Sequence, residues 1–463
     1  MGDVLGVFHA DRRIGQLRFD AAEQLYAFQY EKSWADDPHA FSLAPLLPKQ
    51  EALLSGSAVK FFFSNLLPEG QMLELVAKSH AVSQYDPFGL LRKIGAECAG
   101  ALKILETEVA SGDGRTYTPV SNGELSARAR VDAPDVLSNL GGKVRMSLAG
   151  VQDKLPVVVD GENRVFVPEM GSASTHILKP NHRDWKRFPH TTVNEHFCMT
   201  LARRLGLDVP RSFLISVPER IYVVERFDRV FVTPLVVVPK AGAFELQGEP
   251  VHRRHQIDVC QLLGLPPTQK YEEPEYQTVP GPGVAAVVEA VSAATGEALR
   301  SRRSLIDWVI FNYLIGNSDS HSKNVSLLWV DERWRLAPSY DLLSVAVYSD
   351  DPEKLHDFAL KIGGETHYGW ITGASWHEFA AALGVSYRYV GNALKGMAER
   401  ITKESAALKA EISSTLAAEE KIVLAKIVAL IALHASYADE SSKTISQAAH
   451  SARASTPRAR SPR

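Results

Sequence analysis

Alternating hydrophobic and polar residues predict strands in the first half of the chain, whereas helical periodicity dominates the second half. Residues 4–8 alternate as in a strand, and the apolar runs within 156–167 flank an Asp-Gly turn, which predicts a β-hairpin. Apolar residues recur at helical spacing over 192–205 and a glycine follows, so we expect a helix that ends there. A buried strand is expected at 220–225, and nearly every segment after about residue 250 favours a helix.

One hairpin interrupts the helical half of the chain. Apolar residues alternate over 325–329 and again over 334–336, and Asp331-Glu332 between them favours a turn. We therefore expect an α+β, two-lobed protein-kinase-like fold. Along the chain, a small N-terminal subdomain comes first, a β-rich lobe follows, and an α-helical lobe comes last. The expected boundaries are 1–110 for the N-terminal subdomain, 111–124 for a linker, 125–235 for the β-rich lobe, 236–440 for the helical lobe and 441–463 for a disordered basic tail.

Composition and charge add few constraints. The chain has 463 residues, of which 45% are hydrophobic and 23% charged, as is ordinary for a globular protein of two or three domains. The formal charge of −3 indicates no particular partner. No acidic residue occurs after Glu440, and the Ser-, Ala- and Arg-rich end predicts a solvated, disordered tail.

Cysteine spacing and targeting signals indicate a cytoplasmic protein. Cys98, Cys198 and Cys260 show no CxxC spacing, so neither a zinc site nor a disulfide framework is expected, and a reducing compartment fits. The N-terminus lacks the basic region and apolar core of a signal peptide. The longest apolar stretch, 422–435, contains Lys426 and is too short to span a bilayer, so we expect no membrane contact.

The segment before the hairpin carries the clearest chemical signal. Asp319 and Asn324 have the spacing of a kinase catalytic loop, in which the Asp accepts the proton of the attacking hydroxyl and the Asn ligates magnesium. A second aspartate must hold the metal that bridges the ATP phosphates, and the hairpin would return the chain to deliver Asp341 beside Asp319. Both predicted ligands are hard oxygen donors, as Mg²⁺ requires. The plain alternative is an Asx-rich turn before a hairpin.

Further parts of a kinase site occur in kinase order. Lys179, at the end of a strand, is the candidate cation for the phosphates, although a solvated lysine at a strand end is the ordinary alternative. Glu195, on the following helix, is its candidate partner. The strand that leads into 223–229 lies where a hinge between lobes would contact adenine, with Phe227 packing nearby.

Loop residues complete the predicted site. Lys323 would neutralise the transferring phosphoryl group, and His321 would orient the loop. Neither a GxGxxG sequence nor a Walker A sequence occurs in the β-rich lobe. The segment 146–154, which contains Gly150 among small residues, is the candidate backbone cradle for the phosphates.

Taken together, six separated motifs resemble the HipA family of serine/threonine kinase toxins from bacterial type II toxin–antitoxin modules. The resemblance extends from the N-terminal unit, including Asn65-Leu-Leu-Pro-Glu-Gly70, to about residue 440. The motifs are Ser147-Leu-Ala-Gly-Val-Gln-Asp-Lys154, His176-Ile-Leu-Lys-Pro180, Asn194-Glu195, Val224-Glu-Arg-Phe-Asp-Arg229, Gly316-Asn-Ser-Asp-Ser-His-Ser-Lys-Asn324 and Tyr340-Asp341.

The resemblance implies a role for each matching residue. It implies ATP contact at Lys179, adenine contacts at Glu225 and Phe227, a nucleotide-site position for His321, catalysis by Asp319 and magnesium binding by Asn324 and Asp341. Ser147 matches a serine that family members phosphorylate on themselves, which expels the phosphate-covering loop. A phosphate there adds about −2 charge at pH 7, which a loop that holds triphosphate oxygens would repel.

The resemblance also implies partners. The N-terminal subdomain would contact a small helix-turn-helix antitoxin of the HipB type, and through it DNA. The implied substrates are translation components, aminoacyl-tRNA synthetases especially, with growth arrest as the outcome. Two alternatives stay open at this point: a kinase of a small-molecule or lipid substrate, and a catalytically silent co-repressor that acts with the antitoxin.

Overall fold

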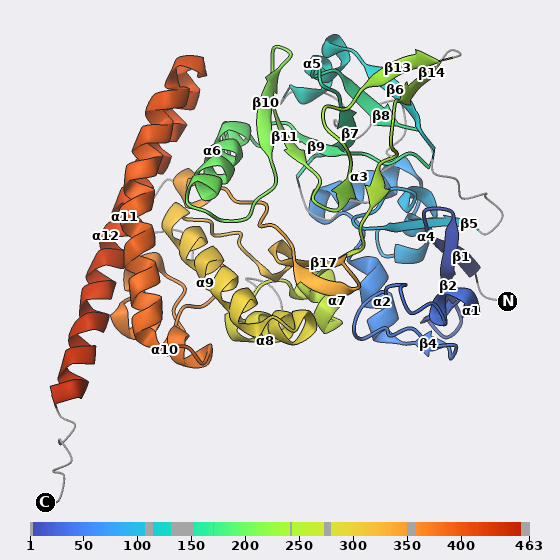
Figure 1. Cartoon of the computed structure of the whole chain (residues 1–463). Helices are drawn as coiled ribbons and strands as arrows, with labels where there is room; N and C mark the ends of the chain where they lie inside the picture. Colours follow the sequence, from blue (N-terminus) through green and yellow to red (C-terminus); the bar gives the residue numbers. More distant parts are fainter. Residues whose placement is uncertain are drawn as a thin grey trace, which may run out of the picture. The chain divides into compact units, whose positions relative to one another are not determined.

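The structure, a computed structural model, consists of two compact units that interleave along the chain (Figure 1). It describes residues 3–106, 114–130, 152–169, 171–240, 243–272, 279–349 and 358–454. Unit 1 comprises Met1–Thr192, Pro210–Lys270 and Ser322–Pro338, and unit 2 comprises Val193–Val209, Tyr271–His321 and Ser339–Arg463. Unit 1 contains all the sheets of the described chain and unit 2 is helical, so the predicted α+β class is confirmed.

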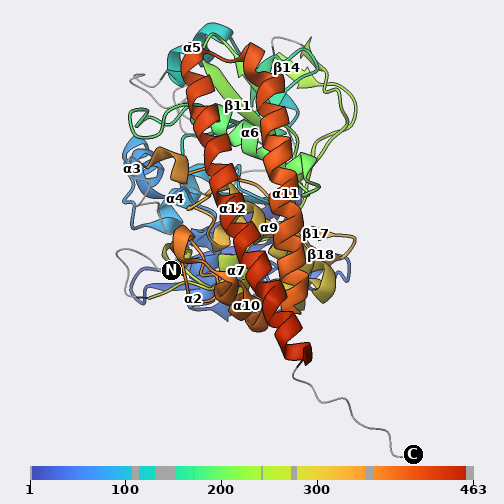
Figure 2. The ribbon, with the colours of Figure 1, turned by 90° about the vertical axis from the view of Figure 1, so that its left-hand side faces the viewer.

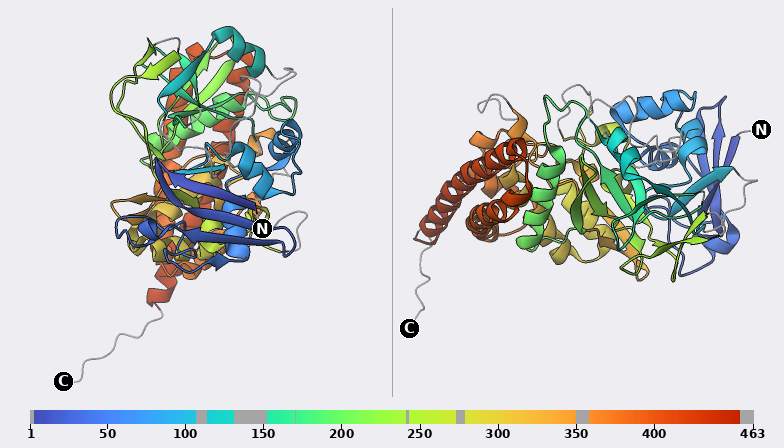
Figure 3. Two further views of the ribbon diagram at one scale, coloured as in Figure 1. Left: turned by 90° about the vertical axis from the view of Figure 1, so that its right-hand side faces the viewer. Right: turned by 90° about the horizontal axis from the view of Figure 1, so that it is seen from above.

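The N-terminal part of unit 1 is a five-stranded antiparallel sheet, whose first strands are seen in dark blue in the left panel of Figure 3. Leu5, Leu17 and Phe28 stand opposite one another on adjacent strands and are fully buried, so they form the centre of its core. The strands are β1 (Asp3–His9), β2 (Arg12–Asp20), β3 (Leu25–Tyr30), β4 (Leu54–Ser55) and β5 (Leu102–Glu106), in the order β4-β3-β2-β1-β5. The accompanying helices are α1 (Lys32–Ala35), α2 (Ser57–Ser64), α3 (Gly70–Ser79) and α4 (Pro87–Ile94).

The second sheet of unit 1 has eight antiparallel strands in the order β10-β11-β9-β7-β8-β6-β14-β13. The predicted hairpin over 156–167 is confirmed as β7 and β8, and Asp160 fixes its turn by accepting backbone N–H bonds from Glu162 and Arg164. The strands are β6 (Thr116–Val120), β7 (Leu155–Val159), β8 (Val165–Pro168), β9 (His176–Lys179), β10 (Ser212–Ser216), β11 (Arg220–Glu225), β13 (Val237–Lys240) and β14 (Ala243–Leu246).

The segment predicted as a linker at 111–124 is structured wherever the chain is described. Strand β6 pairs with β8 and β14. Tyr117 and Val120 point to opposite faces of the sheet, and both are buried, each in a separate hydrophobic core. The end of this segment begins helix α5 (Asn122–Ala129). Ser121 and Glu124 exchange the two bonds of a capping box there.

The hairpin predicted after Asn324 is also confirmed. Strands β17 (Ser326–Val330) and β18 (Arg333–Leu336) pair with each other, and β17 also pairs with β16 (Gln256–Asp258). Asp331 and Glu332 both have positive φ, 50° and 60°, as a two-residue type I′ turn requires. These strands belong to unit 1, although they lie within 236–440; the domain boundaries drawn from the sequence stay predictions.

Unit 2 is built on long helices. Helices α11 (Tyr387–Ile412) and α12 (Ala418–Ala454) run side by side (Figure 2). The other helices are α6 (Thr191–Arg204), most of which lies in this unit, α8 (Val284–Thr295), α9 (Ala298–Ile315) and α10 (Gly373–Ala382). The predicted disorder of 441–463 is wrong as far as Ala454, because α12 continues to that residue; Ile445 is buried and would contact a side chain at Gly391 of α11.

Helix α12 contains an apolar segment whose length and composition fit either a membrane span or a core helix. In the described part of the chain, one segment, Ala418–Ile445, is long and apolar enough to cross a membrane by those two criteria. Its apolar residues Leu424, Ile427 and Ile431 are fully buried in the packing of unit 2. A core helix of this kind passes the same test as a membrane span.

Candidate active site

The catalytic-loop sequence begins where helix α9 ends. Gly316 caps the helix with a φ of 69°, and a side chain there would stand 2.9 Å from Leu430 and 3.1 Å from Ala346. Glycine therefore satisfies both the left-handed backbone and the close packing. Because α9 is buried along much of its length, the loop starts from a rigid element.

Asn317 links two of the predicted site residues within unit 2. Its side-chain oxygen accepts the backbone N–H of Asp319 at 3.2 Å, and its amide donates to the backbone oxygen of Asp341 at 3.2 Å. The amide also donates to the side chain of Asn312 on α9 at 2.7 Å. Asn317 is 1% exposed, so these bonds are shielded from water and fix the backbone of both aspartates.

The Asp319 side chain has a partner that the sequence analysis did not identify. The Tyr271 hydroxyl donates a hydrogen bond to Asp319 Oδ1 at 2.6 Å. His321 packs edge-on against the Tyr271 ring, with centroids 5.0 Å apart, and its backbone N–H donates to the backbone carbonyl oxygen of Asp319. Tyr271 thus orients the half-buried carboxylate and also contacts the predicted nucleotide-site residue His321.

Asp341 has an unusual backbone conformation. Its φ is 53°, in the left-handed region that aspartate and asparagine enter more readily than other non-glycine residues. The next residue, Leu342, is fully buried and anchors the segment in unit 2. Asp341 is therefore held on one side by Asn317 and on the other by core packing.

Asn324 lies in unit 1, in the short 3₁₀ turn Ser322–Asn324, and is 7% exposed. Ser322 fixes this turn by donating its backbone N–H and its hydroxyl to the Lys270 oxygen, at 3.1 and 2.9 Å. Across the described ranges, no three His, Cys, Asp or Glu side chains gather as a metal site. The side-chain oxygens of Asn324, in unit 1, and Asp341, in unit 2, are the hard donors that Mg²⁺ prefers, and their joint use as ligands stays a prediction.

The environment of Lys323 argues against its predicted role at the transferring phosphoryl group. Its side chain is 4% exposed, and its ammonium donates to Asp258 Oδ2 and Asn65 Oδ1, both at 2.6 Å. Glu69 lies 3.7 Å away and also binds Lys270, at 2.8 Å. Asn65, Glu69, Asp258, Lys270 and Lys323 are called the loop cluster below. Sequence spacing predicts that Lys323 lies in the loop, but it does not predict the direction of the side chain.

Lys179 occupies the predicted strand end. It is the last residue of β9, is 6% exposed, and stands opposite Tyr222 of β11. Its ammonium lies 5.9 Å from the centre of the Tyr222 ring. Glu195 belongs to unit 2 and Lys179 to unit 1, so the pairing of the two stays a prediction.

The predicted hinge has two alternating sets of side chains. Glu225 ends β11 and lies 3.7 Å from Arg211, and both Glu225 and Phe227 are half-buried. Between them Arg226 is buried, and its backbone N–H donates to the Thr175 oxygen at 2.9 Å. The residues predicted to contact adenine therefore alternate with residues that enter the protein interior.

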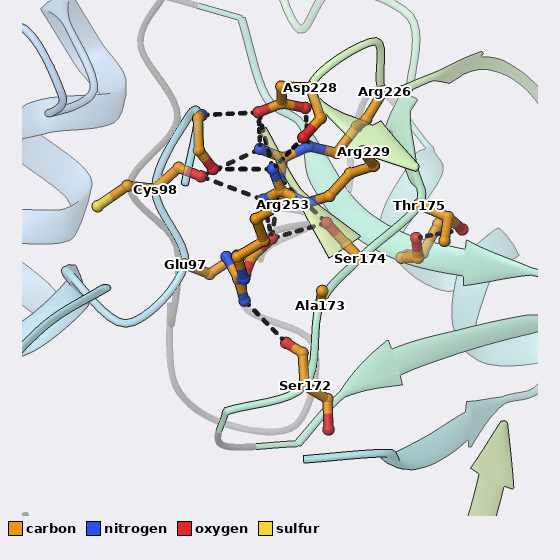
Figure 4. A network of polar contacts seen from close by, with 12 residues as sticks. Glu97, Cys98, Ser172, Ala173, Ser174, Thr175, Arg226, Asp228, Arg229 and Arg253 are labelled. Carbon is orange, nitrogen blue, oxygen red and sulfur yellow. Dashed lines mark hydrogen bonds and ion pairs between the residues drawn. The ribbon is translucent and has the colours of Figure 1, made fainter. Parts of the chain in front are cut away.

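The interior set forms a buried ionic cluster, shown in Figure 4. Glu97 accepts bonds from Arg226 at 2.9 Å and Arg229 at 3.0 Å, and lies 2.5 Å from Arg253. Arg226 also binds Asp228 through two nitrogens, at 2.9 and 2.7 Å. These five residues are called the hinge cluster below. The cluster joins the Glu97–Gly100 segment of the N-terminal part to the hinge sequence, and Gly100 donates its N–H to Asp228 at 2.7 Å.

The arginines keep both carboxylates of the hinge cluster ionised. Burial raises the pKa of Glu97, but Arg253, Arg229 and Arg226 outweigh it and lower the pKa to about 2. Burial likewise opposes ionisation of Asp228, yet Arg226 and Arg229 hold its pKa well below the usual range. Removal of one partner would leave an uncompensated buried charge.

Two predicted site residues, Ser147 and Gly150, lie outside the described residues. The described chain resumes at Gln152, whose side-chain amide donates to the Pro180 oxygen at 3.2 Å. The predicted phosphate-covering segment is thereby joined to the residue that follows Lys179.

Both the N-terminal and the C-terminal parts of this sequence are similar to domains of known proteins. The HipA-like C-terminal domain matches residues 146–405, and the HipA N-terminal domain matches residues 5–105. The putative kinase Y4mE of Sinorhizobium fredii is 34% identical over 414 residues, which cover 86% of this chain and 91% of that protein. The serine/threonine-protein kinase toxin HipA of Shewanella oneidensis is 30% identical over 401 residues, which cover 84% of this chain and 86% of that toxin.

A solved structure of a HipA protein is also similar to this chain. A chain from the complex of Shewanella oneidensis HipA, HipB and operator DNA aligns with a TM-score of 0.79 at 27% identity, covering 95% of this chain and 99% of its own length. The kinase-like α+β fold predicted from the sequence is thereby confirmed. The chain belongs to the HipA-like family.

Proposed function

We propose that this chain transfers the γ-phosphate of ATP to serine or threonine side chains of a protein, as the toxin of a type II toxin–antitoxin module. Relatives named as kinases support phosphotransfer. The structural observation that carries the proposal is Asn317, whose buried side chain links Asp319 to Asp341 within unit 2. A solvated Asx turn has no need of such a buried link.

Each residue then has a task. Asp319 accepts the proton of the attacking hydroxyl, and the bond from Tyr271 holds its carboxylate in one orientation. Asn324 and Asp341 would hold Mg²⁺, which neutralises phosphate charge when bound. Lys179 would contact the ATP phosphates.

The proposed nucleotide contacts come from the half-buried hinge residues and from the buried His321. Glu225 and Phe227 would contact adenine, since their neighbours Arg226 and Asp228 are directed into the hinge cluster. His321, packed on Tyr271, would lie at the nucleotide. Ser147 is the proposed site of self-phosphorylation.

We extend the partnership of the Shewanella oneidensis toxin to this chain. That toxin is named in a complex with HipB and operator DNA. A helix-turn-helix antitoxin would bind the N-terminal subdomain here and connect it to DNA. The proposed substrate is a translation component such as an aminoacyl-tRNA synthetase. Its phosphorylation would cause growth arrest, and the reaction would take place in the cytoplasm.

The test compares purified wild-type protein with Asp319→Ala in Mg-ATP. We expect phosphotransfer to fall by at least about 10²–10³-fold, as for loss of one preorganised catalytic contact. Asp331→Asn, in the exposed turn between β17 and β18, is the matched control and should keep wild-type activity. Unreduced transfer in Asp319→Ala would show the base assignment to be wrong.

The other outcomes separate the alternatives. A wild-type protein that binds Mg-ATP but labels no protein would indicate a kinase of a small molecule or lipid. A protein that binds no Mg-ATP, yet binds operator DNA with its antitoxin, would indicate a co-repressor.

A further inference from the structure

Lys323 stands inside the catalytic-loop sequence, one position before the predicted metal ligand Asn324, yet its side chain is directed into unit 1. An ammonium group has three N–H donors. In Lys323 they meet Asp258 Oδ2 at 2.6 Å, Asn65 Oδ1 at 2.6 Å and the Asn65 backbone oxygen at 3.4 Å. Its side chain is 4% exposed, and the Asp258 carboxylate supplies an opposite charge to the buried ammonium.

Asn65 is suited to this partner by its own bonds. Its amide nitrogen donates to the Phe61 oxygen and to the Leu265 oxygen, both at 2.8 Å. Both amide hydrogens therefore have acceptors, and the side-chain oxygen is left to accept from Lys323. An aspartate at this position would put its second oxygen against two carbonyl oxygens.

Glu69 reaches the same loop by a second route. It binds the Lys270 ammonium at 2.8 Å, and the Lys270 backbone oxygen accepts both bonds from Ser322. Glu69 also lies 3.7 Å from Lys323. Asn65 and Glu69 both belong to the motif Asn65-Leu-Leu-Pro-Glu-Gly70 of the N-terminal part.

Asp258 completes the arrangement from a third segment. Its Oδ1 accepts the backbone N–H of Gln261 at 2.9 Å and caps helix α7 (Val259–Leu263), while its Oδ2 accepts from Lys323. Gln261 in turn donates to the Phe62 oxygen at 3.0 Å. The lysine thus enters a preformed set of acceptors on rigid elements.

We propose that Lys323 is a positioning residue that fastens the catalytic loop to Asn65 and Glu69 of the N-terminal subdomain, so that this subdomain contributes directly to phosphotransfer. The kinetic part of this inference rests on the proposed function. Displacement of a reacting group by about 1 Å can cost about 10²-fold in rate, so a loosened loop lowers activity without any lost substrate contact.

The first test is a double-mutant cycle on phosphotransfer. Lys323→Met and Asn65→Ala should each lower kcat by about 10–100-fold, and the double variant should be no worse than the more severe single variant. If Lys323 instead bound the phosphoryl group, its loss and the loss of Asn65 would multiply. Tyr30→Phe removes a buried hydroxyl that bonds Leu43 and Leu47 in the same subdomain, and should leave kcat unchanged.

The second test does not depend on activity. Hydrogen–deuterium exchange is measured on peptides that contain the Ser322 and Val325 amides, whose bonds close the turn. Exchange should rise by about 10-fold or more in Lys323→Met and Asn65→Ala, and not in Tyr30→Phe. Glu69→Gln, which removes a charge but keeps the side-chain size, serves if the stronger variants fail to fold.

The outcomes are distinct. Wild-type exchange in folded Lys323→Met, Asn65→Ala or Glu69→Gln protein would overturn the positioning role. A wild-type protein that transfers no phosphate would overturn the proposed function, while the exchange result would still decide whether Lys323 anchors the loop.

Discussion

The hinge cluster and the loop cluster both connect the N-terminal part of unit 1 to sequences predicted to serve the active site, but they are built differently. In the hinge cluster three guanidinium groups share two carboxylates, and Arg226 binds Asp228 through two nitrogens. In the loop cluster two ammonium groups take part: Lys323 donates to Asn65 and Asp258, and Lys270 binds Glu69 while its backbone oxygen accepts from Ser322. Planar guanidinium groups give the hinge cluster shared and bidentate contacts, whereas an ammonium is a point charge without a fixed fork geometry. We therefore assign the first cluster mainly to stability and the second mainly to catalytic geometry.

The largest expected effect on stability is that of Glu97→Gln. Glu97 contacts three arginines, so its loss leaves buried positive charge without compensation and should lower the free energy of unfolding by about 3–5 kcal/mol. Urea denaturation measures this change. Glu31→Gln, at an ion pair with Arg13 whose side chains are 39% and 32% exposed, is the control and should cost under about 1 kcal/mol. Equal losses in the two variants would remove the distinction between the cluster and an ordinary surface pair.

The two clusters should lose their contributions to the free energy of unfolding at opposite ends of the pH scale. The folded pKa of Glu97 lies below its unfolded value of 4.5, so its contribution to stability is complete above pH 4.5 and is lost as the pH falls toward about 2. The folded pKa of Lys323 lies above 10.5, so its contribution is complete below that pH and is lost as the pH rises through the folded pKa.

Unfolding free energies across pH measure both effects. In acid, Glu97→Gln should show a slope shallower than wild type by up to about 1.4 kcal/mol per pH unit. Above pH 10.5, Lys323→Met should show the shallower slope. Parallel curves for variant and wild type in either range would contradict the assigned pKa direction.

The smallest expected effect is that of Ser174→Ala. The Ser174 hydroxyl donates to Glu97 at 2.8 Å and accepts from Arg226 at 3.0 Å. Because the hydroxyl is neutral but both of its partners are charged, its loss should cost about 1.5–3 kcal/mol, measured by urea denaturation. A loss as large as that of Glu97→Gln would show that the network depends on each member and has no redundancy.

The sequence predicted those parts of the fold that local pattern determines. Alternation with a turn located β7–β8 and β17–β18, and helical spacing located α6. It failed where tertiary packing decides. The Ser- and Ala-rich residues after 440 lack the marks of a stable helix, yet α12 continues through Ile445, which is buried and lies against the small Gly391 of α11.

The candidate site shows the same division. The spacing of Asp319, Asn324 and Asp341 was visible because it is a property of the chain. No role was predicted from the sequence for Tyr271 or for Asn317, although Asn317 lies in one of the six motifs, because a single tyrosine or asparagine gains significance only from its contacts. For Lys323 the residue type suggested a phosphate, and only the buried partners indicate another role.

Peptide mass spectrometry after incubation with Mg-ATP tests the central claim most directly. The account predicts phosphate on Ser147 in wild-type protein and at least about 10²-fold less in Asp319→Ala. Equal modification of both proteins would contradict the assignment of Asp319. No phosphate on any wild-type peptide would contradict the claim that this chain is a self-phosphorylating protein kinase.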